Sequence, residues 1–149
     1  MDTEILKGSS ATNLVTLEVI GVDNTGDTRI DLDFVRIFPD GTVPPGPPWF
    51  RVPPNYLLIV TDADWQYNLG EPGRIQTFRI FIENIAEPSI CSRVFESTIT
   101  LNGNGEGGIS ESMTSGFAVS SKGRMTVDCM PGGGVISHII LRGYLIREH

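Results

Sequence analysis

The chain has 149 residues, of which 40 % are hydrophobic and 19 % charged, so it can bury a core and is too apolar for a disordered protein. Its formal net charge is −7 and it has no cluster of Lys or Arg, which argues against nucleic acid and anionic membrane surfaces as partners. The 17 glycines and 10 prolines favour turn-rich β structure, and we expect a single β-sandwich domain over residues 1–149.

The N-terminal residues carry neither the basic region nor the apolar core of a secretory signal. No apolar stretch approaches the roughly 18 residues of a membrane-spanning helix. We therefore expect a cytoplasmic protein or a component of a particle. Residues 1–11 precede the first strand pattern, and we expect them to form a flexible or exchanged arm.

Alternating apolar and polar residues mark the first strands. Leu14–Val22 is one candidate, and Arg29–Phe38 is the next. Between Phe34 and Val35 the apolar positions change parity. A β-bulge, or a strand that crosses from one sheet to the other, would explain this change.

Proline dominates Val43–Phe50, which predicts a stiff extended loop outside any sheet. Two interpretations of Trp49 and Phe50 at its end remain open. The rings form an exposed platform for a ligand, or they close one end of the sandwich.

The stretch Val52–Trp65 organises the sequence. Two prolines precede Tyr56–Val60, which is too short for a helix and rich in β-branched and aromatic residues. Because it is apolar at odd and even positions alike, both of its faces should be covered. We expect it to be the central strand and to end in Thr61–Trp65.

Five further segments complete the predicted strands. They are Thr77–Glu83, Val94–Leu101, Met113–Ser121, Arg124–Cys129 and Val135–Arg147. We expect hairpins at Asn102–Gly108 and Lys122–Gly123.

Seven to eight closely spaced strands without helices predict an all-β fold, a two-sheet antiparallel sandwich that is jelly-roll-like. An immunoglobulin-like sandwich is the alternative. It is less favoured because Trp49 and Trp65 both precede Cys91, so the Cys–Trp–Cys order is absent.

Catalytic motifs are mostly absent. Gly103–Gly108 satisfies G-x-G-x-x-G, but it leads into a strand instead of the helix that would hold a pyrophosphate. His138 is the sole internal histidine, which cannot build a multi-histidine metal site, and no G-x-S-x-G nucleophile motif exists. We therefore favour a non-catalytic protein over an enzyme.

Metal binding and cysteine chemistry are also weakly supported. Aspartates recur between Asp23 and Asp40, yet without EF-hand spacing, so a Ca-dependent binding domain is only an alternative and we expect no cofactor. Whether Cys91 and Cys129 form a bridge is open, and we favour buried free thiols.

Two predicted strands lack a polar face, namely Tyr56–Val60 and Val135–Arg147. We therefore expect a homo-oligomer in which the outer face of one sheet is buried, with a trimer favoured by analogy with ring-forming jelly rolls. The alternative is a monomer whose long loops cap both sheets.

The first functional hypothesis is a non-catalytic structural or recognition unit that binds itself and a glycan or protein surface. Its expected contact residues are Trp49, Phe50, Asp62, Asp64, Trp65 and Tyr67. The alternative is a carboxylate-dependent hydrolase with a cleft near Asp62, Asp64 and Glu71. A purely structural subunit of a particle is a third possibility.

Overall fold

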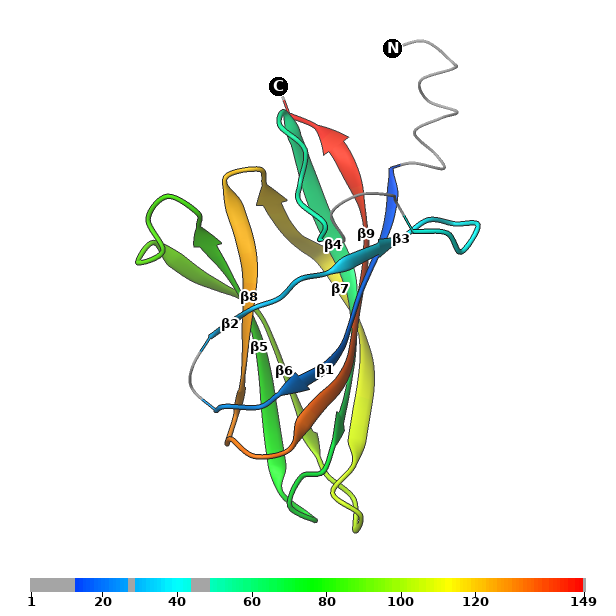
Figure 1. Ribbon diagram of the computed structural model, residues 1–149, viewed down its shortest axis with the longest axis vertical. Helices are drawn as coiled ribbons and strands as arrows, with labels where there is room; N and C mark the ends of the chain where they lie inside the picture. The colour runs from blue at the N-terminus through cyan, green and yellow to red at the C-terminus, as the bar shows by residue number, and fades with distance from the viewer. Residues whose placement is uncertain (1–12, 27–28, 44–48, 149) are drawn as a thin grey trace.

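The computed structural model describes residues 13–26, 29–43 and 49–148, which form nine β-strands (Figure 1). The strands are β1 (Leu14–Asp23), β2 (Ile30–Asp31), β3 (Val35–Ile37), β4 (Tyr56–Asn68), β5 (Ile75–Asn84), β6 (Cys91–Thr100), β7 (Gly107–Ser120), β8 (Gly123–Met130) and β9 (Val135–Arg147). The expected arm over residues 1–11 and the prolines at 44–48 lie outside the described residues.

Two antiparallel sheets face each other, which confirms the predicted sandwich. The five-stranded sheet has the order β3-β1-β9-β4-β7, and the four-stranded sheet has the order β2-β8-β5-β6. Strand β1 pairs with β9, and β2 pairs with β8 in the opposite sheet. Early strands thus pair with late strands in both layers of the sandwich. The described residues contain one strand more than the seven to eight expected.

The additional strand comes from the parity change in the sequence. The segment expected as one strand, Arg29–Phe38, contains β2 in the four-stranded sheet and β3 in the five-stranded sheet. The connecting chain crosses the open side of the sandwich between them (Figure 1). Leu32 and Phe34 are buried on the way across. Of the two explanations for the parity change, a bulge or a crossing, the structure shows the crossing.

Strand β4 is longer and less central than expected. It continues past Thr61 to Asn68, with a register shift between Val60 and Asp62 against both of its neighbours. The middle strand of its sheet is β9, whose bounds are those expected, Val135–Arg147. Leu58 and Val60 are buried, whereas the outer face of β4 is only half-buried.

The two expected hairpins are wrong. Strands β6 and β7 lie in different sheets, and so do β7 and β8. The turns at Asn102–Gly108 and Lys122–Gly123 therefore pass between sheets. Packed sheets are about 10 Å apart, a distance that three extended residues span. A short turn sequence can therefore join two strands of one sheet or two strands of facing sheets.

The core between the sheets is aromatic at its centre. The ring of Trp65 on β4 stacks on Phe78 of β5 at a centroid distance of 5.1 Å, and Phe95 of β6 meets Phe78 edge-on at 6.3 Å. Aliphatic side chains from β1, β8 and β9 complete this core. The rings thus join the two sheets across their facing surfaces.

Candidate functional site

Trp65 lies in the core and not at the surface where a ligand contact was expected. Its side chain is 0 % exposed, and its indole Nε1 donates a hydrogen bond of 2.8 Å to Ser97 Oγ. The register shift after Val60 has a direct consequence here. It turns Trp65 inward and turns Asp62 and Asp64 outward, so these carboxylates do not lie beside the ring.

Tyr67 is buried as well and holds loops together. Its hydroxyl accepts a hydrogen bond of 2.7 Å from Asn24 Nδ2 and donates one to the carbonyl of Gly133. Burial raises the pKa of this hydroxyl. The ring therefore joins the end of β4 to the segments that follow β1 and β8, and only 2 % of the residue is exposed.

Trp49 and Phe50 occupy different environments. Trp49 is 48 % exposed, whereas Phe50 is half-buried and packs against the core. The Phe50 amide donates a hydrogen bond of 2.7 Å to the carbonyl of Phe34. Phe50 thus helps to close one side of the sandwich, and Trp49 keeps an exposed ring.

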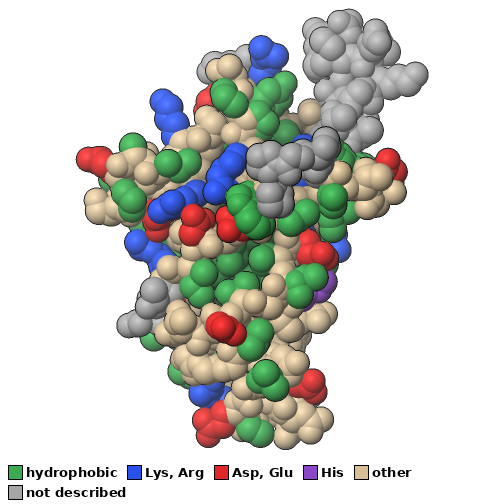
Figure 2. Space-filling view, viewed as in Figure 1, with side chains coloured by type: hydrophobic (Ala, Val, Ile, Leu, Met, Phe, Trp, Pro, Cys, Tyr) green, Lys and Arg blue, Asp and Glu red, His purple; other side chains and the backbone are tan. Residues whose placement is uncertain are grey.

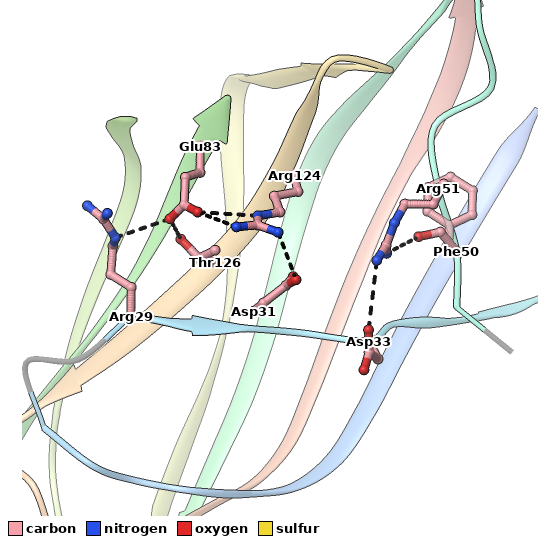
Figure 3. Close-up of polar contacts among 8 residues, drawn as sticks. All are labelled: Arg29, Asp31, Asp33, Phe50, Arg51, Glu83, Arg124 and Thr126. Atoms are coloured by element: carbon pink, nitrogen blue, oxygen red, sulfur yellow. Dashed lines mark hydrogen bonds and ion pairs between the residues drawn. The ribbon is translucent and has the colours of Figure 1, made fainter. Parts of the chain in front are cut away.

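The outer face of the four-stranded sheet is covered by its own ion pairs (Figure 3). Glu83 is buried beneath Arg124 and Arg29, with N–O distances of 2.7 and 3.3 Å. Arg124 also contacts Asp31 at 3.3 Å. Figure 2 shows basic and acidic side chains side by side in this part of the molecule. The charges of Glu83, Arg124, Arg29 and Asp31 are therefore satisfied within the chain.

The outer face of the five-stranded sheet differs at its two ends. At one end the register places six apolar side chains together, which we call the apolar patch. It consists of Leu14, Leu57, Ile59, Ala118, Tyr144 and Ile146. Leu14, Tyr144 and Ile146 are 57 %, 41 % and 40 % exposed.

Polar side chains form the middle of that face. Asp62 accepts hydrogen bonds from Ser112 at 2.6 Å and from Thr61 at 2.8 Å. These two bonds, with a smaller contribution from the charge of Arg142, lower the pKa of the Asp62 carboxyl. On the neighbouring strands, His138 Nε2 lies 2.8 Å from Glu18 Oε2.

A hollow of about 600 Å³ lies at the other end of the face. It is formed by the end of β4, the beginnings of β7 and β9, and the loop between β6 and β7, at the lower end of the molecule in Figure 1. Its polar lining comes from Asp64, Gln66, Asn68, Asn102, Glu106, Ser110 and Ser137. Of the expected contact residues, Asp64 supplies a polar group, whereas Tyr67 reaches the hollow from the core.

Sequence reasoning did not find Asn68, Asn102, Glu106 or Ser137. They come from three separate parts of the chain, and turn composition around Asn102 was the only local signal. Glu71, proposed for a hydrolase, is exposed in the loop after β4 and pairs with Arg74 at 3.6 Å.

Metal binding and thiol chemistry were the other possibilities that the sequence raised, and the described residues bear on both. In the described part of the chain, no group of three His, Cys, Asp or Glu side chains could hold a metal ion. Cys91 and Cys129 are both free thiols, half-buried and buried respectively. The described residues include no helical segment that could span a bilayer.

Comparison with known proteins gives no family to which the chain can be assigned. No protein-family model matches the sequence, and no curated protein matches it. Functional conclusions therefore depend on the geometry of this molecule.

Proposed function

We propose that the chain is a non-catalytic jelly-roll module that assembles with copies of itself and acts as a structural or recognition unit. The observation that carries this proposal is the apolar patch on the outer face of the five-stranded sheet. Leu14, Tyr144 and Ile146 expose large apolar surfaces side by side there. Contiguous apolar surface of this kind marks interaction sites in soluble proteins.

The charges next to the patch favour a second copy as the occupant. Arg142 is exposed and has no ion pair with any described residue, although Asp62 lies opposite it on β4. The same face carries the acidic Glu18. A face with both signs of charge is complementary to itself, so symmetric copies can set the arginine of one against a carboxylate of the next.

Asp62 is poorly suited to be the general acid of the alternative hydrolase. A general acid in glycoside hydrolysis needs a raised carboxyl pKa, so that it keeps its proton near neutral pH. The hydrogen bonds to Asp62 act in the opposite direction and lower its pKa. This carboxylate is held ionised as an acceptor for Ser112 and Thr61.

The proposal is tested by the solution mass of the chain, measured by light scattering behind a sizing column. We expect an oligomer, with a trimer near three times the chain mass of 16.3 kDa. Ile146→Asp should shift the mass to that of the monomer, because burying an unpaired charge in an apolar contact is costly. A monomeric parent protein would refute the proposal.

A matched control separates the patch from general effects of a surface charge. Ile75 is 59 % exposed at the start of β5, in the four-stranded sheet, so Ile75→Asp should leave the oligomer intact. If Ile75→Asp dissociates the oligomer as well, the patch is not the specific contact. Leu14→Asp provides a second patch variant, and circular dichroism shows whether each variant is folded.

A further inference from the structure

The loops that form the hollow at the end of the five-stranded sheet are held in place by backbone hydrogen bonds. The loop after β6 is closed by backbone hydrogen bonds, from Asn102 to Glu106 at 2.8 Å and from Gly105 to Asn102 at 3.0 Å. Gly70 donates to the carbonyl of Gly105 at 3.0 Å, which ties this loop to the one after β4. Gly108 on β7 adds no side chain to the hollow beside Gln66.

Three side chains around the hollow are each fixed by hydrogen bonds at one end. Asp64 Oδ2 accepts from Ser110 at 2.8 Å, and Asn68 Oδ1 accepts from the amide of Leu69 at 2.8 Å. Asn102 Oδ1 accepts from the amides of residues 104 and 106 at 2.9 and 3.0 Å. Because their orientations are set in this way, little side-chain entropy remains to be lost on binding.

The opposite end of each of these side chains remains available. Asp64 Oδ1 is an acceptor, and the Nδ2 groups of Asn68 and Asn102 are donors, with no hydrogen bond to any described residue. The Gln66 amide adds a donor and an acceptor in the same lining. The hollow therefore presents donors and acceptors together.

The charge of the lining narrows the class of ligand. Asp64 and Glu106 are acidic, and none of the described residues that line the hollow is Lys or Arg. Phosphate, sulfate and carboxylate groups would be repelled. Among the described residues of the lining, Ile109 alone has a large aliphatic side chain, so an apolar ligand would find little contact.

We propose that this hollow binds a neutral saccharide through Asp64, Asn68, Asn102 and the neighbouring Gln66. Sugar hydroxyls both donate and accept hydrogen bonds, which matches carboxylate acceptors set beside amide donors. The volume of about 600 Å³ lies within the range of pockets for small ligands. The inference rests on the recognition role proposed above and names its ligand class.

The test is a titration of the full chain, followed by the NMR signals of backbone and side-chain amides. The probes are neutral trisaccharides of glucose, mannose, galactose and N-acetylglucosamine, with a sialylated trisaccharide as the anionic comparison. We expect one or more neutral sugars to shift the side-chain amide signals of Gln66, Asn68 and Asn102, and the anionic sugar to shift them less.

Substitutions identify the contact. Asp64→Asn removes a charged acceptor and should weaken binding by about tenfold or more. Asp62→Asn is the matched control, because Asp62 lies two residues away on the same face of β4 but outside the hollow, and it should leave the affinity unchanged. Thermal unfolding of both variants confirms that they are folded.

Three outcomes would overturn the inference. The first is that no neutral sugar shifts the amide signals of the lining residues, and the second is that the anionic sugar binds more tightly than the neutral ones. The third is that Asp62→Asn weakens binding as much as Asp64→Asn does. The mass of the same samples is measured separately, so a failure to bind sugar and a failure to assemble are distinguished.

Discussion

The hydrogen bond between Trp65 and Ser97 is a polar link inside the core, and it provides a sharp test of the structure. Trp65 belongs to β4 of one sheet and Ser97 to β6 of the other. The 2.8 Å bond joins two side chains that are 0 % and 3 % exposed, so water cannot replace a lost partner. The substitution Ser97→Ala removes the acceptor of this bond.

The expected cost follows from what remains after the substitution. Ser97→Ala leaves the indole N–H buried and unsatisfied, which should lower the free energy of unfolding by about 1–3 kcal/mol. In a Trp65→Phe background the N–H is already absent, so the same substitution should cost about 1 kcal/mol less. Trp65→Phe itself should cost more, because it also reduces the stacking on Phe78.

Urea denaturation of the four proteins in this cycle, followed by circular dichroism, measures these differences. Ser92, exposed on the same strand, supplies the control, and Ser92→Ala should change the free energy by less than about 0.5 kcal/mol. If Ser97→Ala costs the same with and without the indole, the proposed hydrogen bond does not exist.

Three further predictions concern the cysteine thiols and one close backbone contact. Burial raises the pKa of the Cys129 thiol from 9.0 to about 11, so its contribution to stability is complete below pH 9 and is lost as the pH rises through the folded-state value. At neutral pH a thiol reagent should modify Cys91 alone in the native protein and both thiols in urea; rapid reaction of both in the native state would contradict this burial. A Cβ atom at Gly143 would lie 1.8 Å from the carbonyl oxygen of Ile59, so Gly143→Ala should prevent stable folding. Gly103→Ala, where no atom lies within 4 Å, should leave the thermal midpoint unchanged, and equal midpoints for both variants would refute the close approach of β9 to β4.

The alternation of apolar and polar residues predicted the strands correctly wherever every second side chain is buried. The bounds of β9 were predicted as Val135–Arg147, and the change of parity at Phe34 and Val35 indicated either a bulge or the crossing between sheets that the structure shows. Apolar residues at both parities also indicated that the outer faces of β4 and β9 carry hydrophobic side chains. Such features can be predicted from the sequence because successive side chains of a strand point to opposite faces, so the polarity of each residue indicates whether its own face is buried.

The candidate site could not be predicted in the same way. The register shift after Val60 reverses the parity of the residues that follow. Continuing the alternation of Tyr56–Val60 past Thr61 would place Asp64 inward and Trp65 outward, which is the opposite of the structure. The hollow joins Asp64, Asn68 and Asn102 with residues of β7 and β9. Nothing in their spacing brings them together.

The sequence by itself therefore determined an acidic all-β domain, the positions of most strands, and the apolar character of one outer surface. Only the tertiary structure decided which strands are neighbours, that Trp65 and Tyr67 belong to the core, and where polar groups converge. The physical reason is that strand pairing in a sandwich is non-local. Hydrogen bonds between β1 and β9 join residues more than a hundred positions apart, and no local pattern encodes such a partner.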